Sequence, residues 1–362
     1  MFLNADKPAN ICEQDIETPW LTGQTIDFIN QAVGPWMAHV NYKKPHWPYI
    51  VPSPYHNMFG PNHAPPAKRH EVEREDRHPV YGAYMGNKIA SAFQREDVRD
   101  KVLPAYMGLI KQCDGQLGRL LDHLEATGRM QDTMIVLTSD HGDYLGDHWL
   151  GEKDLFHEAS VKVPLIIYDP RVEAGVTRGT TCDALVESID LAATFVEVAG
   201  GPVPDHILEG RSLMPWLCGE TPAWRKYVIS EYDYSATPQA AKLGVAPRDA
   251  RLFMVYDGRY KMMHAEGGMR PMLFDLLEDP EEFYDLAKGS EHNEIIDKLY
   301  LDLRHWGLRM SQRVTKSEGD IIAMRGRSLR RGVLPFLVDG SEVLDELTAK
   351  YRGPIRQDYT KD

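Results

Sequence analysis

The stretch TSDHGDYLGDHWLGEKDLFHE, residues 138–158, decides how this chain of 362 residues is interpreted. It grows out of residues 133–139, whose nearly continuous apolar run predicts a strand buried on both faces of a parallel sheet. In open α/β sheets, ligands bind beyond the carboxyl ends of the strands, and Asp140 and His141 lie at such an end. A solvated loop can be this charged, but it rarely places Asp-His-Gly directly after a buried strand. The stretch therefore raises the hypothesis of half an active site.

The segments on either side of this stretch predict an α/β layer fold. Leu, Ile and Met at helical spacing indicate a long helix over residues 98–127, with Pro104 kinking or starting it. A second strand is expected over residues 163–168, and a strand-like DALVES within residues 180–199 leads into a helix. Nearer the N-terminus we expect a short helix over residues 25–33 and a strand over residues 36–42.

The pattern changes after Trp224, where short strands replace the α/β alternation. Asp257-Gly258 is a hairpin signal between two of them. We expect a small antiparallel sheet closed by a helix over residues 291–312, and the strands are predicted over residues 227–232, 252–257, 260–264 and 272–276. The chain then divides into an α/β domain (residues 1–224), a small α+β subdomain (225–312) and a basic C-terminal arm (313–362).

Composition limits the classes of partner. The net charge of −13 argues against nucleic acids and anionic membranes, which are bound through excess Lys and Arg. The four cysteines have no C-x-x-C spacing and are expected to be reduced thiols. No secretory signal and no apolar run long enough to span a membrane is seen, so a cytoplasmic location is expected.

Asp140 and His141 are the candidate metal ligands, because adjacent oxygen and nitrogen donors suit a borderline divalent ion. Gly142 lets the backbone turn sharply after them. Taken alone, the pair also fits a helix cap and a packed imidazole. Lys153 on the same loop favours the functional interpretation, since a lysine beside a metal can hold an anionic oxygen or stabilise a leaving group.

The segment Lys44-Pro45-His46-Trp47-Pro48 is the second candidate, since two prolines hold the backbone around His46. His46 beside Lys44 is a plausible anion clamp and general acid, although a Pro-rich turn with a packed aromatic ring explains the segment equally well. Weaker candidates, of which some are expected to orient the ligands, are Asp147, His148, His157 and Glu158.

Four segments in this order resemble the sulfatase family of the alkaline phosphatase superfamily. SDHGDYLGDHWLGEKDLFHEASVKVPLIIYDP is similar to its C-terminal metal motif, and KKPHWPY to its K-P-H-x-P segment. ESIDLAATFVEVAGGPVPDHILEGRSLMPWLCG and MLFDLLEDPEEFYDLA resemble the segments that follow. Asp-His in the metal motif, with HWPY and PLIIYDP, is similar to the phosphonate monoester hydrolase and phosphodiesterase branch.

This resemblance implies an alkaline-phosphatase-like α/β sandwich with a central mixed sheet and a small C-terminal antiparallel sheet. It implies Asp140 and His141 as ligands of a divalent metal (Mn, Ca or Zn). His46, Lys153 and, with a less defined role, Lys44 would act on a small ester substrate. Members of this branch tend to form homo-oligomers, which gives the C-terminal arm a use.

One part of the family pattern is not found in these residues. The resemblance implies a first strand ending in paired aspartates, followed by C-x-P-x-R or S-x-P-x-R, which carries the nucleophile. None of the four cysteines has that context. We therefore expect an N-terminally truncated member, through a mis-set start codon, a cloning boundary, gene decay or a partner chain that supplies the rest.

Three functions stay open at this point. The leading one is a metal-dependent hydrolase of sulfate, phosphonate or phosphate esters. A rival from another class is a non-catalytic remnant of the fold that serves as a binding or interaction protein. The third is a phosphatase or phosphodiesterase of the same superfamily with another nucleophile, such as Ser or Thr.

Overall fold

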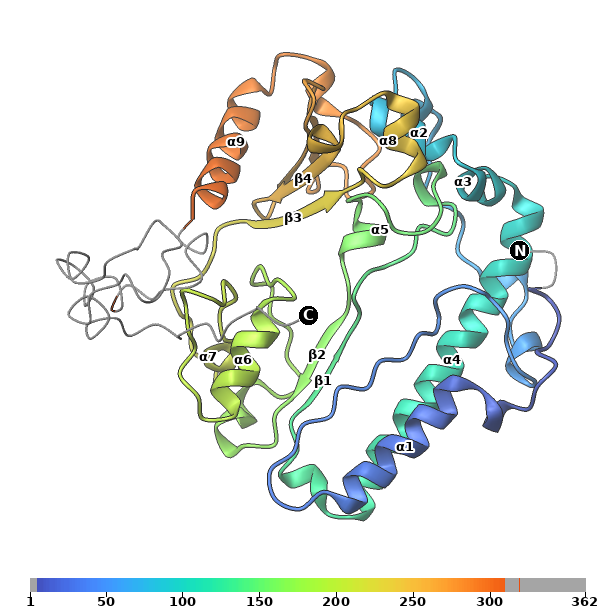
Figure 1. Cartoon of the computed structure of the whole chain (residues 1–362), viewed down its shortest axis with the longest axis vertical. Helices are drawn as coiled ribbons and strands as arrows, with labels where there is room; N and C mark the ends of the chain where they lie inside the picture. The colour runs from blue at the N-terminus through green and yellow to red at the C-terminus, as the bar shows by residue number, and fades with distance from the viewer. Residues whose placement is uncertain (1–4, 310–318, 320–362) are drawn as a thin grey trace, which may run out of the picture.

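The computed structural model describes residues 5–309 and Gly319. The predicted C-terminal arm therefore lies outside the described residues, apart from Gly319. The described residues form a two-stranded ribbon and a four-stranded sheet. Figure 1 shows the ribbon beside a pair of long helices, and the sheet with its own helix at the other end of the molecule. None of the helices in the described ranges is long and apolar enough to cross a membrane. All four cysteines are free thiols.

The long helices α1 (Glu17–Gln31) and α4 (Glu96–Ala126) lie side by side. The prediction of α4 is confirmed, and the helix continues on both sides of Pro104. The predicted short helix over residues 25–33 is the second half of a longer one. The strand predicted over residues 36–42 is wrong, because this segment runs extended without pairing to another strand. Its alternation reflects contacts of Trp36 and Tyr42 with α1 rather than pairing in a sheet.

Strands β1 (Ile135–Thr138) and β2 (Leu165–Tyr168) form a two-stranded ribbon. Both strands were predicted, but the parallel, doubly buried environment expected for the first of them is wrong. They pair antiparallel, with Ile135 opposite Tyr168, and Leu137 and Ile166 are 38% and 61% exposed. The apolar runs indicate that these strands could be buried on both faces. The residues that the structure describes pack against only part of the two strands.

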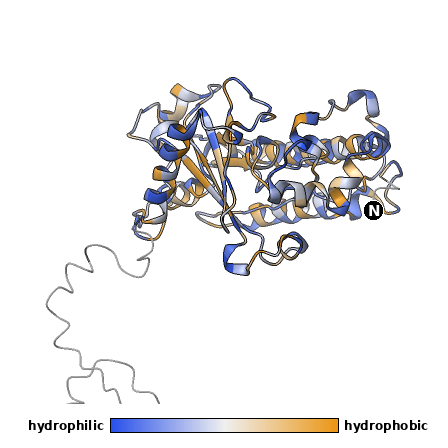
Figure 2. Cartoon of the chain, turned by 90° about the horizontal axis from the view of Figure 1, so that it is seen from above, coloured by the Kyte–Doolittle hydropathy of each residue, from blue (hydrophilic) through white to orange (hydrophobic). Residues whose placement is uncertain are grey.

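The C-terminal sheet matches its prediction. It has the order β3 (Val228–Asp233), β4 (Arg251–Tyr256), β5 (Tyr260–Ala265) and β6 (Met272–Asp275), and every neighbouring pair is antiparallel. Asp257 and Gly258 lie at the β4–β5 turn, where Gly258 has a φ of 95°. Figure 2 shows apolar residues along these strands and mixed faces on the helices.

Both faces of this sheet are covered, because its strands carry apolar side chains on both sides. Val255, Met262 and Leu273 stand side by side on one face and pack against α9 (Asn293–Gly307), which was predicted over residues 291–312. The opposite face packs against α2 (Pro79–Met85) and the loop that follows β1, and its buried strand residues are Leu252, Met254, Met263, Ala265, Met272 and Phe274. The loop with the candidate site therefore rests on the C-terminal sheet.

Short helices complete the described part. The DALVES stretch before α6 (Asp190–Val198) contains no strand, so that part of the prediction is wrong, while the helix itself is confirmed. Residues 57–79 pack back over the loop after β1, where the carbonyl oxygens of Lys68 and His70 accept hydrogen bonds from it. The bounds are α3 (Lys88–Phe93), α5 (Glu158–Val161), α6 (Asp190–Val198), α7 (Met214–Leu217) and α8 (Pro238–Leu243).

Candidate active site

The structure brings His46 and Lys153 together although 107 positions separate them in the chain. The Lys153 ammonium donates to Nε2 of His46 at 2.8 Å. On the other side of the ring, Nδ1 lies 2.9 Å from the carbonyl oxygen of Trp47. A carbonyl oxygen can only accept, so Nδ1 carries the proton and Nε2 presents a lone pair. Lys153 and His46 therefore form a donor–acceptor pair at the end of the ribbon.

Asp140 and His141 lie next to this pair. The rings of His46 and His141 are edge to face, with centroids 5.8 Å apart. Oδ2 of Asp140 is 3.6 Å from Nε2 of His141. Two ligand atoms of one tetrahedral ion, each at about 2.1 Å, would stand about 3.4 Å apart. The separation in the structure therefore fits two ligands of one metal ion.

The tautomer of His141 also fits a metal. Its Nδ1 lies 2.7 Å from the carbonyl oxygen of Gly142 and must donate to it, which leaves the Nε2 lone pair toward Asp140. A backbone carbonyl on the second ring nitrogen is the usual device that orients a metal-binding histidine. The Asp140 side chain is 86% exposed, as a ligand open to an ion or a further chain segment would be.

Gly142 allows this geometry by close packing rather than by an unusual φ angle. Its N–H donates to the carbonyl oxygen of Ser160 at 2.7 Å. A Cβ atom built on Gly142 would overlap the backbone oxygen of Ala159. Only glycine therefore lets the chain after His141 lie against the start of the segment that leads to β2.

Lys44 takes a different place from the one predicted. Its ammonium donates to the carbonyl oxygens of Pro48 at 2.6 Å and His46 at 3.2 Å, within its own turn. Burial lowers the pKa of this ammonium. Lys44 thus holds the turn around His46, and a direct contact with substrate stays a prediction that this geometry does not favour.

Two carboxylates near the site were not singled out from the sequence. Asp143 accepts a hydrogen bond from the Tyr49 hydroxyl at 2.9 Å, which ties the loop after β1 to the His46 segment. Burial raises the pKa of Asp143 to about 6. Burial also raises the pKa of Glu152, which lies in the field of Lys153, His46 and His141. The φ of 61° at Glu152 is a feature that residue types alone do not reveal.

His148 and His157, the weaker candidates, lie behind the site rather than in it. Their rings stack with centroids 3.8 Å apart and an interplanar angle of 8°. Nδ1 of His148 pairs with Glu73 at 2.7 Å, and Nδ1 of His157 with the Tyr144 hydroxyl at 3.0 Å. Glu73, His148 and His157 have the donor types of a metal site. An ion in the plane of one stacked ring would lie outside the plane of the other, so we assign no metal there.

Glu158 and Asp147 are also structural in this arrangement. Glu158 pairs with the buried ammonium of Lys261 on β5 at 2.6 Å, and Lys261 also pairs with Glu282 at 2.9 Å. Lys261 holds the pKa of Glu158 below its usual range against the effect of burial. Asp147 accepts from the backbone N–H of Lys68 at 2.9 Å. Both residues therefore fix the loop to its surroundings.

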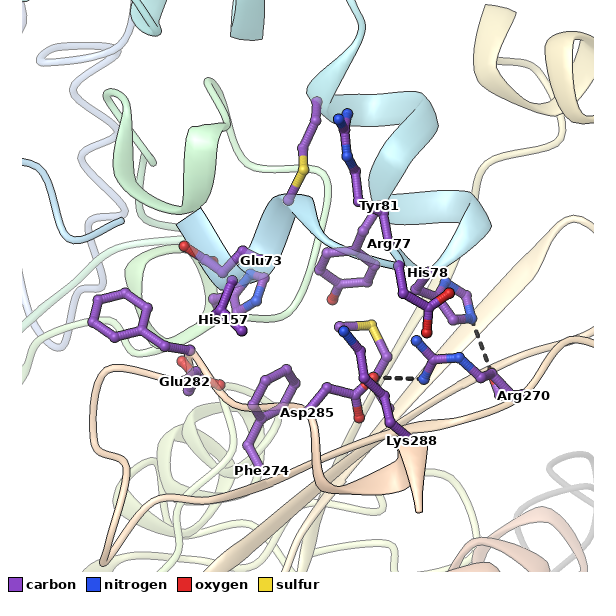
Figure 3. Close-up of a pocket in the computed structure, with 15 residues that line it drawn as sticks. Glu73, Arg77, His78, Tyr81, His157, Arg270, Phe274, Glu282, Asp285 and Lys288 are labelled. Atoms are coloured by element: carbon purple, nitrogen blue, oxygen red, sulfur yellow. Dashed lines mark hydrogen bonds and ion pairs between the residues drawn. The ribbon is translucent and has the colours of Figure 1, made fainter. Parts of the chain in front are cut away.

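A cavity next to the stacked histidines is too small for an ester substrate. It has a volume of about 30 Å³ and lies between residues 72–85, His157 and the C-terminal sheet. Figure 3 shows charged side chains around it, including Arg270 paired with Asp285. A volume of this size holds about one or two water molecules, whereas ligand pockets reach roughly 300–1,000 Å³. The candidate site is the open cluster around His46 and Lys153, because the residues with reactive chemistry meet there.

Comparisons with known proteins match most of the chain. The model of the family described as Sulfatase matches residues 8–201, and the model described as N-sulphoglucosamine sulphohydrolase, C-terminal, matches residues 146–307. The multifunctional alkaline phosphatase superfamily protein PehA of Trinickia caryophylli is 30% identical over 85% of this chain and 62% of its own length. An arylsulfatase of Clostridium perfringens is 26% identical over 78% of this chain and 56% of its own.

Solved structures give the same result. The phosphonate monoester hydrolase from Silicibacter pomeroyi is 31% identical, with a TM-score of 0.77 over 86% of this chain and 63% of that chain. The phosphonate monoester hydrolase of Agrobacterium radiobacter is 30% identical, with a TM-score of 0.75 over 84% of this chain and 63% of that chain. The chain thus spans somewhat less than two thirds of these relatives. With one family model matching more than half of its residues, the chain belongs to the sulfatase family, a hydrolase family of the alkaline phosphatase superfamily.

Proposed function

We propose that this chain is an ester hydrolase and that these residues form the leaving-group and metal-binding part of its site. The observation that carries the proposal is the Lys153–His46 pair at 2.8 Å beside Asp140 and His141. The Lys153 ammonium binds an anionic oxygen of the ester. The same ammonium, which His46 orients by accepting one of its hydrogen bonds through Nε2, stabilises the oxygen of the departing alcohol. The proposal assigns no nucleophile.

Asp140 and His141 are the residues that would hold a divalent metal, as used by enzymes of this superfamily. Such an ion polarises an ester oxygen and neutralises charge at the reacting centre. The donor set of one carboxylate oxygen and one imidazole nitrogen fits Mn²⁺ and Zn²⁺, while Ca²⁺ prefers oxygen ligands alone. Manganese and zinc are therefore the first ions to test.

For the substrate, we propose a phosphonate monoester or phosphodiester before a sulfate ester. Support comes from the two phosphonate monoester hydrolases, which match 86% and 84% of this chain at 31% and 30% identity, whereas an arylsulfatase K of Xenopus laevis with 31% identity matches 67% of it. Homo-oligomeric assembly and a cytoplasmic location remain predictions from the sequence.

Metal binding is tested first, because it does not depend on turnover. The purified 362-residue chain is loaded with Mn²⁺ or Zn²⁺, desalted and analysed for metal content. We expect one ion per chain in the wild type and none in Asp140→Ala. Asp132→Ala, which removes an exposed carboxylate at the other end of β1, is the matched control and should keep the ion. Equal metal content in all three proteins would reject this ligand assignment.

Hydrolysis is then measured with p-nitrophenyl phenylphosphonate, bis-p-nitrophenyl phosphate and p-nitrophenyl sulfate. We expect the phosphonate to be the best substrate. Because Lys153 acts on charge that develops at the leaving oxygen, Lys153→Ala should lower kcat by about 10²–10³-fold. Lys162→Ala, an exposed lysine on the same loop, should leave the rate unchanged. Absence of hydrolysis of all three esters by the metal-loaded chain would overturn the proposed activity.

A further inference from the structure

Asp154, the residue after Lys153, is held by the C-terminal sheet. Its Oδ1 accepts a hydrogen bond from the hydroxyl of Tyr232, on β3, at 3.1 Å. The hydroxyl of Tyr84, on α2, donates to the Tyr232 oxygen at 3.4 Å. Because Tyr84 occupies the acceptor side of this phenol, the Tyr232 O–H is directed at Asp154. Two elements outside the loop thus decide where the Asp154 carboxylate points.

The neighbourhood offers Asp154 a second donor. Burial raises the pKa of Asp154, and the charge of Lys153 acts on it in the opposite direction. A partly buried carboxylate without a donor is unfavourable, so Asp154 needs either the Tyr232 phenol or an ammonium. Burial also raises the pKa of Tyr232 far above neutrality, so the phenol remains a donor at every physiological pH.

The backbone at Lys153 does not determine which donor, the Tyr232 phenol or the Lys153 ammonium, pairs with Asp154. The Ser160 hydroxyl donates to the carbonyl oxygen of Lys153 at 2.5 Å, and Ser160 is buried. The main chain is therefore fixed from the other side of the loop. The direction of the Lys153 side chain depends on which acceptor competes for its ammonium, His46 or Asp154.

We propose that Tyr232 is a positioning residue for Lys153. By holding the Asp154 carboxylate, it prevents an Asp154–Lys153 ion pair, so that the ammonium stays on Nε2 of His46 and faces the ester. This inference rests on the proposed role of Lys153 and adds a function for the C-terminal sheet. The sheet keeps a charged neighbour away from the leaving-group lysine.

The test is the acetylation rate of Lys153 in the full chain, read by mass spectrometry at one pH. In Tyr232→Phe, we expect Asp154 to capture the ammonium and to slow acetylation of Lys153 by about tenfold, because a charge-assisted hydrogen bond must then be broken. Tyr256→Phe is the matched control, since this phenol of the neighbouring strand donates to the carbonyl oxygen of Gly258 instead. Its Lys153 should react at the wild-type rate.

A rescue variant separates positioning from damage to the fold. In Tyr232→Phe combined with Asp154→Asn, the competing charge is gone, and the acetylation rate of Lys153 should return to within about twofold of the wild type. An unchanged rate in folded Tyr232→Phe overturns the inference. A slowed rate that the second substitution fails to restore also overturns it, because the effect would then be structural.

Turnover gives the second readout. If the chain hydrolyses a phosphonate monoester, Tyr232→Phe should lower kcat by about tenfold with KM changed less than twofold, and the double variant should recover kcat. A chain that hydrolyses none of the test esters fails the proposed function, whereas the acetylation experiment still decides the positioning role. The two failures are thereby distinguished.

Discussion

The C-terminal sheet and the β1–β2 ribbon are built from similar apolar strands but have different environments. In the sheet, Val255, Met262 and Leu273 are completely buried under α9. In the ribbon, Leu137 and Ile166 remain exposed within the described part of the chain. A two-stranded ribbon is only marginally stable alone, whereas a sheet covered on both faces supports itself. The candidate site follows the weaker of the two elements.

This difference indicates that the site is held from the side of the sheet. Tyr144, Leu150, Leu155 and Phe156 of the loop after β1 are buried in the same cluster as the inner face of the sheet. Lys261 adds ion pairs to Glu158 and Glu282 across this boundary. The geometry of the loop therefore depends more on the C-terminal sheet than on the strand that precedes it.

The largest test of this dependence is Lys261→Met. The Lys261 side chain is 1% exposed, and its loss leaves the buried Glu282 without this cation and Glu158 with only the exposed Lys162. We expect a loss of about 3–5 kcal/mol in the free energy of unfolding, measured with urea. Lys298→Met, which breaks the ion pair of the 60% exposed Lys298 with Asp257, should cost less than about 1 kcal/mol. Equal losses would contradict anchoring by Lys261.

A smaller effect is expected from Gly142→Ala on the loop itself. The new methyl group would overlap the Ala159 carbonyl oxygen, so the loop must move. Overpacking of this kind costs about 1–3 kcal/mol, and urea unfolding measures it. Gly118→Ala on α4 is the control, because no atom lies near the added methyl group, and it should stabilise the protein by about 0.4–1 kcal/mol. A neutral Gly142→Ala would show that the two loop segments separate at little cost.

The pH dependence of stability tests the packing between α2 and the sheet. Burial lowers the pKa of His78 to about 4, below its unfolded value of 6.5. Below pH 6.5 the unfolded state binds the proton more readily, so stability present above that pH is lost as pH falls toward 4. At pH 5 the loss from His78 should be about 2 kcal/mol.

His78→Gln isolates this contribution. Glutamine can still donate to the Arg270 carbonyl oxygen, which His78 contacts through Nε2 at 2.9 Å, but it does not titrate. Urea unfolding at pH 7.5 and pH 5 should show a smaller loss in the variant than in the wild type. The same loss in both proteins would mean that other groups, such as the buried His157, carry the acid sensitivity.

Sequence patterns predicted the elements well where the local signal and the environment agree. The four C-terminal strands and α4 have clear periodicity and were recovered nearly at their bounds. The strand predicted over residues 36–42 and the parallel sheet predicted around β1 were wrong. Alternation and apolarity indicate what a segment can bury, whereas strand pairing depends on partners elsewhere in the chain. The strand predicted for the DALVES stretch was wrong for the same reason.

The residues of the candidate site could be predicted from the sequence, but the contacts among them could not. Family motifs pointed to His46, Lys153, Asp140 and His141, and the structure brings these four together. Tyr232 contributes through a strand 78 positions away from Asp154, with no motif near it. Lys44 resembled a clamp in sequence, but its ammonium holds its own turn. Contacts between distant segments were the missing information.

The smallest expected effect concerns the ribbon. Ile166 is 61% exposed, so Ile166→Ala should cost less than about 1 kcal/mol in urea unfolding. Leu273→Ala in the covered sheet, where Leu273 is fully buried, should cost about 2–5 kcal/mol. A cost above about 2 kcal/mol for Ile166→Ala would mean that residues outside the described part, or a second chain, cover the ribbon. In that case the ribbon would be as well covered as the sheet, and the difference between the two regions would hold for the described residues alone. The site after β1 would then be stabilised both by the C-terminal sheet and by the ribbon.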